Sequence, residues 1–383
     1  NISGRVRVDN THTKYEQKLY ASSNLTITEE STQGHYTISK PDETQTYADV
    51  LANINKRFND FSLVANVGAS IVNNRYEDLS YRGPIREKGI PNVFNVFDLD
   101  NTKKKARQDE WQEQTQSVFA SVEVGWKSML YLTLTGRNDW ASQLANSSTP
   151  CFFYPSVGLS GVISEMLTLP EFIDYMKVRG SFSSVGMPYP RNLTSPTYEY
   201  DEANQQWKPK THYPIKDLKP ERTNSWELGL DMRLFKDFSL GFSWYLANTF
   251  NQTFDPKVSV SSGYSKIYLQ TGYVRNSGVE LSLGYGHTWN NHLHWESNFT
   301  LSHNKNTIKD LVTSYIHPET GLPITQNRLD VGGLGKARFI LKKGGTLGDL
   351  YTQSDLKRDN SGMVEIDPSG ALTTEDNLPD IKL

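Results

Sequence analysis

Histidines are the side chains of this 383-residue chain with the widest chemical use, because imidazole binds metals and carries protons near neutral pH. Five of the eight do not fall at the spacing of zinc ligands: His212, His287, His292, His294 and His303. His292 and His294 would share one face of a strand, which permits a metal site without indicating one. We therefore predict no metal and no cofactor.

Three short phrases are similar to loops that bind ligands or carry a nucleophile, and each lacks a required residue. RDNSGMV, at 358–364, resembles part of a calcium loop, but Lys357 stands at the first ligand position. GGLGK, at 332–336, is too short for a phosphate loop, and Ala337 follows it in place of Ser or Thr. GLSG, at 158–161, lacks the G-x-S-x-G pattern of a nucleophile elbow. We predict a tight turn at 358–364, no catalytic residue and no enzyme.

The remaining candidates would contact a solute rather than transform it. Five aromatic residues in polar segments could stack on sugar rings or grip a peptide: Trp140, Tyr189, Tyr198, Trp207 and Tyr213. Five charged residues alternate with apolar ones and are expected to point into a hydrated lumen: Glu227, Asp231, Arg233, Glu280 and Glu296. The alternative for the aromatic group is packing between loops. For the charged group, ion pairs that hydrate the interior are favoured over direct solute contact.

Strands must position these residues, because a two-residue period recurs along the chain. In SWELGLDMRLFKDFSLGFSWYLA, Ser225–Ala247, large apolar residues alternate with small or charged ones on both sides of a turn at Lys236-Asp237. The same alternation marks 61–71, 118–126, 130–135, 176–182, 279–285 and 293–301. This period is typical of β-strands with one apolar and one polar face. We expect one helical turn, near Thr168–Glu171, where a helix-start pattern occurs.

The connections between these strands favour a membrane barrel. Short turns alternate with long polar segments at roughly 72–112, 139–153, 185–221, 251–275 and 304–336. Compact soluble domains rarely contain such loops, whereas outer-membrane barrels have short periplasmic turns and long extracellular loops. The apolar faces would then contact lipid and the polar faces would line a lumen. The alternative is a soluble, secreted β-sandwich that binds glycans, but its strands are usually about 5–6 residues long, shorter than the alternating segments here.

Composition agrees with an all-β chain and excludes several classes. Mean hydropathy is -0.58, and no apolar run is long enough for a membrane-spanning helix. The net charge of -3 gives no reason to expect nucleic acid. A single cysteine, Cys151, excludes an intrachain disulfide. The first residues have no signal-peptide pattern and begin as if inside a strand, so we expect a fragment of a longer protein.

Several phrases in order resemble one family. They are GRNDW (136–140), FFYPSVGLSGVISE (152–165), MKVRGSFSSVG (176–186), LKPERTNSWELGLDMRLF (218–235) and RNSGVELSL (275–283), with VRVDNTHTKYEQKLYAS (6–22) before them and the segment 344–372 after them. In this order and spacing they resemble the barrel of SusC-like TonB-dependent outer-membrane transporters of the Bacteroidetes. The resemblance covers nearly the whole chain.

The resemblance implies a large antiparallel transmembrane β-barrel of about 22 strands with a plugged lumen. Residues 1–383 would form part of that one barrel domain, without the plug, the TonB box or the last strands. The implied function is TonB-dependent import of oligosaccharides or peptides across the bacterial outer membrane. The implied partners are a SusD-like surface lipoprotein, the TonB complex, membrane lipid and a second importer in a pair. A glycan hydrolase is a third hypothesis, but no pair of carboxylates can be selected for it.

Overall fold

A 12-stranded sheet dominates the structure, a computed structural model that describes residues 1–383 except 192, 194–197, 202–205, 210–211, 214–218, 255–265, 268, 290–292 and 317–322. The strand order is β1-β3-β4-β5-β6-β7-β8-β12-β13-β15-β16, and β2 also pairs with β3. Their bounds are β1 Ile2–His12, β2 Tyr15–Leu19, β3 His35–Phe58, β4 Phe61–Pro84, β5 Lys105–Trp126, β6 Leu130–Ala141, β7 Cys151–Val162, β8 Ile173–Met187, β12 Glu221–Leu234, β13 Phe238–Phe254, β15 Leu269–Trp289 and β16 Leu293–Asp310.

Shorter elements lie in the segments between and after these strands. They are the strands β9 Tyr198–Asp201, β10 Gln206–Pro209, β11 His212–Tyr213, β14 Lys266–Ile267, β17 Val312–Ile316, β18 Pro323–Gln326, β19 Arg328–Leu334, β20 Ala337–Lys342, β21 Leu350–Thr352, β22 Asp355–Leu356, β23 Thr374–Glu375 and β24 Ile381–Lys382, and the helical turns η1 Val96–Asp98, η2 Ser142–Leu144 and α1 Ile163–Met166. No helix in the described part of the chain has the length and apolar character to cross a membrane.

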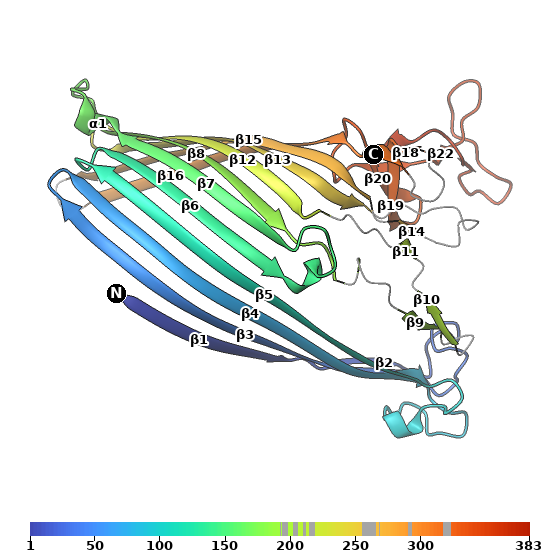
Figure 1. Ribbon diagram of the computed structural model, residues 1–383. Coiled ribbons are helices and arrows are strands. Elements are labelled where there is room, and N and C mark those ends of the chain that lie inside the picture. Colours follow the sequence, from blue (N-terminus) through green and yellow to red (C-terminus); the bar gives the residue numbers. More distant parts are fainter. Residues whose placement is uncertain are drawn as a thin grey trace. The chain divides into compact units, whose positions relative to one another are not determined.

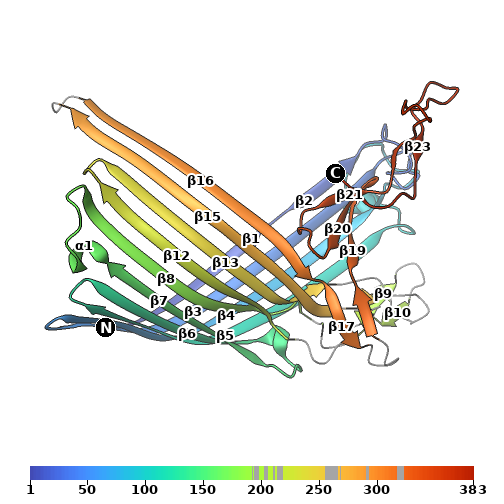
Figure 2. The same ribbon diagram turned by 90° about the horizontal axis from the view of Figure 1, so that it is seen from above.

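Contacts between residues divide the chain into two compact units. The first unit comprises 1–53, 66–119 and 139–142, and the second comprises 54–65, 120–138 and 143–383. In the first unit, β1 pairs antiparallel with β3 along its whole length, from Ile2↔Ala52 to His12↔Asp42. In the second, β7, β8, β12, β13, β15 and β16 pair in antiparallel order, as Figure 2 shows.

The hairpin predicted at 225–247 is confirmed. β12 and β13 pair from Arg222↔Phe250 to Leu234↔Phe238 around a three-residue turn. Phe235 and Lys236 hold φ angles of 53° and 63° in that turn, and the Lys236 N–H donates to Asp174 Oδ2 at 2.6 Å. This bond ties the turn to the segment that begins β8.

The apolar faces of the strands are exposed rather than covered by a second sheet. Trp226 keeps 52 % of its surface accessible, Leu228 56 % and Phe299 56 %. In a sandwich these residues would form the core and would be almost fully buried. The arrangement therefore favours the membrane barrel over the sandwich, because a continuous band of exposed large apolar side chains needs lipid to cover it.

Two expectations about local structure were wrong. The loop expected at 72–112 is confined to 85–104, because β4 and β5 continue well beyond the alternating segments; Figure 1 follows both strands (blue to cyan) along their length. The alternation stops after Ile71 because Asn73 and Arg75 replace apolar residues on the same face. The helical turn is α1, not Thr168–Glu171. Pro170 disfavours helical backbone in the residue before it.

The second unit also contains a small sheet, which follows the strands of the large sheet in the chain. Its order is β19-β20-β21-β24. Its apolar residues meet the ends of β15 and β16 in a cluster of buried side chains: Val274, Ile308, Leu311, Leu329 and Leu341. Asp380 fastens the last segment to this sheet, accepting from Arg328 and lying 2.7 Å from Lys342 Nζ. These two cations lower the pKa of Asp380 far below its ordinary value.

Candidate functional site

The polar face of the second unit carries one row of paired residues that crosses five strands. The register sets Arg179 of β8 opposite Gly229 of β12, Gly229 opposite Ser243 of β13, Ser243 opposite Glu280 of β15, and Glu280 opposite Ser302 of β16. Because strand side chains alternate, this row faces away from the apolar residues. Polar side chains from a stretch of 124 residues, 179–302, therefore lie together on one surface.

Arg179 organises this surface. Its Nη1 donates to Asp231 Oδ2 at 2.7 Å, and its Nη2 donates to Ser243 Oγ at 2.7 Å and to Glu227 Oε1 at 3.4 Å. The guanidinium reaches across β12 because Gly229 has no side chain; a Cβ there would lie 2.5 Å from Arg179 Cζ. The glycine is needed for this close approach, not for an unusual backbone angle.

A hollow of about 290 Å³ opens beside this network, with Arg179, Asp231, Glu280, Ser282 and Ser302 in its lining. Its lining is rich in hydrogen-bonding groups. The charged residues of the lining are Arg179, Asp231 and Glu280, which together give it a formal charge of minus one. Such a surface can hydrogen-bond a polar solute or a polypeptide backbone.

The structure brings together three of the five predicted lumen residues. Glu227 and Asp231 share Arg179, and Glu280 lines the same hollow as Asp231. Arg233 and Glu296 lie elsewhere; Glu296 accepts from Asn298 of its own strand at 3.2 Å. Arg179 itself was missed. The phrase MKVRGSF shows that a cation lies on the polar face, but only the register shows which carboxylates it reaches.

The predicted aromatic residues occupy different environments. Trp140 lies in β6, inside the strand rather than in the loop expected at 139–153, and is 44 % exposed. Tyr189 is buried, with 4 % of its surface exposed, whereas Trp207 in β10 is 68 % exposed. The side chains of Tyr198 and Tyr213 lie outside the described residues.

An aromatic pair that the sequence did not reveal lies on the polar face of the first unit. The rings of Tyr76 in β4 and Trp111 in β5 stack with centroids 5.3 Å apart and planes 13° from parallel. Nearby, Gln45 Nε2 donates to Asn74 Oδ1 at 2.9 Å. Around Tyr76 and Trp111 both strands carry polar residues on both faces. The sequence there has no apolar alternation from which the pair could be predicted.

Carboxylates surround this pair. Partial burial, followed by the negative charges of Asp78, Asp109 and Glu43, raises the pKa of Tyr76, which lies beyond the apolar part of β4. Asp78 accepts from Ser39 Oγ at 2.8 Å, and Asp109 pairs with Arg107 at 2.7 Å. A flat aromatic surface flanked by acceptors suits sugar rings and the cationic groups of peptides alike.

One of the phrases set aside earlier, RDNSGMV, forms a turn. Asp359 of RDNSGMV accepts from the backbone N–H of Ser361 at 2.8 Å and of Met363 at 2.9 Å, which makes the predicted tight turn. Asp367 repeats this geometry eight residues later with Ser369 and Ala371. In the part of the chain that the structure describes, no three His, Cys, Asp or Glu side chains come together as a metal-ligand set.

Comparisons with known proteins agree with this architecture. A family model described as "TonB dependent receptor-like, beta-barrel" matches residues 2–363. TonB-dependent receptor P39 of Formosa agariphila is 23 % identical over 339 residues, which is 84 % of this chain and 30 % of that protein. TonB-dependent receptor P26 of the same organism is 26 % identical over 226 residues, 57 % of this chain and 23 % of that protein.

Solved structures share the fold. The RagAB peptide importer in its "closed-closed" state has a TM-score of 0.71 and 16 % identity, covering all of this chain and 42 % of that chain. A second structure, of the RagAB peptide transporter, has a TM-score of 0.73 with the same identity and coverage. The chain therefore spans less than half the length of these relatives.

Proposed function

Because the chain belongs to the TonB-dependent receptor-like β-barrel family, we propose that it forms part of the wall of an energy-coupled importer of oligosaccharides or peptides. Membership confirms the resemblance to SusC-like transporters, the antiparallel barrel fold and the place in the bacterial outer membrane. The family is one of receptors, not of enzymes. Residues 1–383 are proposed to belong to one barrel domain of a longer protein.

The observation that carries this proposal is the contrast between the two faces of the same strands. On one face Leu228 is 56 % exposed in the apolar band. On the other, one residue away, Glu227 takes part in the Arg179 network. A wall between lipid and a hydrated path needs one apolar and one polar face on the same strands. A soluble core or a closed active site does not need this contrast.

We propose two surfaces for solute contact. The first is the hollow around Arg179, Asp231 and Glu280, whose formal negative charge favours cationic or hydrogen-bonding groups. The second is the Tyr76–Trp111 pair, which offers aromatic surface at the level where the strands rise beyond the apolar band. Of the five aromatic residues predicted from the sequence, Trp207 is the most exposed of those described and stays a candidate, as do Trp140, Tyr189, Tyr198 and Tyr213.

The proposed partners follow from the family and its relatives. They are a SusD-like surface lipoprotein over the outer loops, the TonB complex acting through segments outside this chain, and a second importer. The naming of the structural neighbours as a peptide importer supports peptides as one solute class. No nucleic acid is proposed, since the chain has a net charge of -3.

The proposal is tested by uptake in cells that carry the full-length protein. We expect cells to import a fluorescent oligopeptide or a fluorescent oligosaccharide, one of the two much faster than the other. Deleting the gene or dissipating the proton gradient should abolish the faster uptake. Uptake that survives both treatments would contradict an energy-coupled importer, and recovery of the protein in the soluble fraction would contradict the membrane wall itself.

A further inference from the structure

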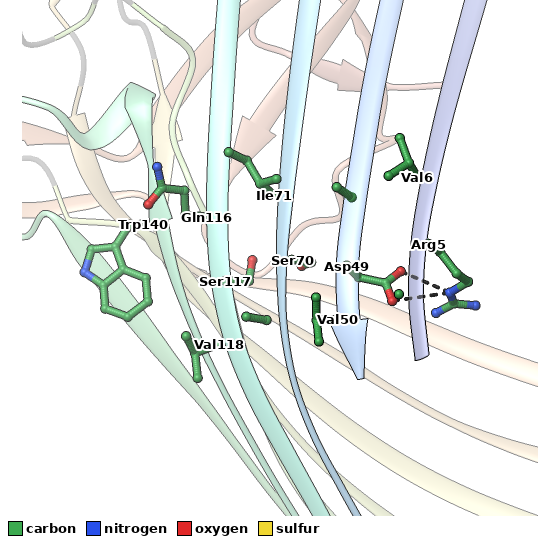
Figure 3. A pocket seen from close by; sticks show the side chains of 13 residues that line it. Arg5, Val6, Asp49, Val50, Ser70, Ile71, Gln116, Ser117, Val118 and Trp140 are labelled. Atoms are coloured by element: carbon green, nitrogen blue, oxygen red, sulfur yellow. Dashed lines mark hydrogen bonds and ion pairs between the residues drawn. The ribbon is translucent and has the colours of Figure 1, made fainter. Parts of the chain in front are cut away.

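The apolar face of the first unit is hollowed, as Figure 3 shows in close-up. The hollow, called the trough below, has a volume of about 630 Å³, within the usual range of ligand pockets, about 300–1,000 Å³. Nine of its thirteen lining residues belong to the apolar face by strand alternation. The trough therefore opens toward the bilayer and not toward the lumen.

Residue size explains why the trough exists. Gly4, Ala48 and Ala69 form its floor on three strands, and taller side chains such as Val6 and Val50, 76 % and 58 % exposed, stand beside them. Arg5 holds the edge strand in place on the opposite face, because its Nε donates to Asp49 Oδ2 at 3.1 Å, drawn as a dashed line in Figure 3. The walls are thus fixed by β-pairing and by a side-chain ion pair.

A recess with a more polar lining than the trough adjoins one of its ends. Its volume is about 440 Å³, and Gln114, Gln116, Trp140, Ala141 and Ser142 line it. Trp140 and Gln116 line both hollows and lie side by side in Figure 3. The change from apolar to polar lining occurs at Gln116, where the alternating apolar residues of β5 end at Val118. The recess therefore lies at the level where lipid headgroups begin.

The recess offers hydrogen bonds but no charge. Ser142 Oγ accepts from the Gln114 backbone N–H at 3.0 Å, and Gln116 Nε2 donates to Gln114 Oε1 at 3.1 Å. Within the described residues, three side-chain groups can then bond a ligand: the NH₂ group of Gln114, the amide oxygen of Gln116 and the hydroxyl hydrogen of Ser142. With no Lys or Arg in its lining, the recess does not match a phosphate, which prefers cationic donors.

We propose that the trough and the recess together bind one molecule of a glycolipid from the outer membrane. An acyl chain lies over Gly4, Ala48 and Ala69, and the sugar lies against the indole of Trp140. The sugar hydroxyls bond to Gln114, Gln116 and Ser142. This site lies on the lipid-facing side, so it is separate from the solute surfaces proposed above and does not depend on them. It would make one lipid a resident part of the wall.

Native mass spectrometry of the full-length protein tests the site. The protein is stripped of lipid in an oligooxyethylene detergent and titrated with monoglucosyl diacylglycerol or with phosphatidylethanolamine of the same acyl chains. We expect one glycolipid to bind at least ten-fold more tightly than the phospholipid. Ala69→Trp, which fills the trough, should weaken binding ten-fold or more. Val279→Trp is the matched control, because Val279 is on the apolar face of the second unit, 37 % exposed, and should change nothing.

A second variant separates the headgroup from the chain. Gln116→Leu should remove the preference for the sugar while leaving the weaker binding of phosphatidylethanolamine unchanged. Equal binding by Ala69→Trp and Val279→Trp would overturn the site, as would a wild-type protein that binds both lipids alike. If Ala69→Trp instead converts a dimer to a monomer without affecting glycolipid, a second copy of the protein occupies the trough and the proposal is wrong.

Discussion

β4 and β5 are longer than β8 and β12, and this difference in length shows which property of a strand apolar alternation indicates. β4 and β5 are 24 and 22 residues long, whereas β8 and β12 have 15 and 14. In β4 the regular alternation of apolar residues stops at Ile71 while the strand continues to Pro84. Alternation therefore reports the lipid environment of a strand, and hydrogen bonding to its neighbours determines where the strand ends.

The two regions also use their polar faces differently. Within the apolar band of β8 and β12, the polar face holds charges in fixed pairs around Arg179. Beyond the band of β4 and β5, it holds the Tyr76–Trp111 pair and hydrogen-bonded amides. Within the band the polar face therefore holds charges paired with one another, whereas above the band it offers aromatic faces to solutes.

The largest expected effect tests which face of the strands contacts lipid and which faces the hydrated path. Leu228→Arg places a charge on the apolar face and should reduce the free energy of unfolding by about 2–4 kcal/mol. Ser181→Arg, on the polar face opposite Glu227, should cost almost nothing. Urea unfolding of the full-length protein in lipid vesicles measures both. Equal costs would contradict the assignment of lipid to the Leu228 face.

The next effect tests the network of the second unit. Gly229→Val would push the Arg179 guanidinium out of its place and should reduce the free energy of unfolding by about 1–2 kcal/mol. The control is a double-mutant cycle with Arg179→Ala, which removes every Arg179 atom that a Cβ at position 229 would meet. If the glycine serves the arginine, Gly229→Val should cost much less once Arg179 is gone, and strictly additive costs would show that the two residues act independently.

A smaller effect on stability is expected at the aromatic pair of the first unit. Trp111→Leu should cost about 0.5–1.5 kcal/mol, because it removes one stacked pair while keeping an apolar side chain. Its effect on solute affinity should be larger, at least five-fold by uptake at low solute concentration. Phe172→Leu, which breaks the stacked Phe172–Phe235 pair at a strand turn, serves as the control and should leave affinity unchanged.

The smallest expected cost is that of Thr46→Arg, which locates the edge of the apolar band in the first unit. Val50 and Thr46 point to the same side of β3, four residues apart. Val50→Arg should cost about 2–4 kcal/mol, and Thr46→Arg about 0–1 kcal/mol, because the cost of a charge falls toward the membrane interface. The same unfolding measurement compares them. A large cost at Thr46 would move the edge outward and would place the Tyr76–Trp111 pair inside the membrane.

The sequence by itself determined the lipid-facing parts of the strands, the hairpin at Lys236-Asp237 and the family. Each depends on residues that are near one another in the chain, either alternating in a strand or following in a fixed order. It also placed Glu227, Asp231 and Glu280 on the polar face, because a two-residue period assigns every side chain to one side.

Only the tertiary structure decided which residues meet. Arg179 reaches Asp231 and Ser243 because the strand register aligns it with Gly229, and register depends on pairing between distant segments. The full length of β4 and β5, the Tyr76–Trp111 pair and the trough over Gly4, Ala48 and Ala69 likewise require neighbouring strands. A single strand contains the side chains, but pairing creates the surfaces between them.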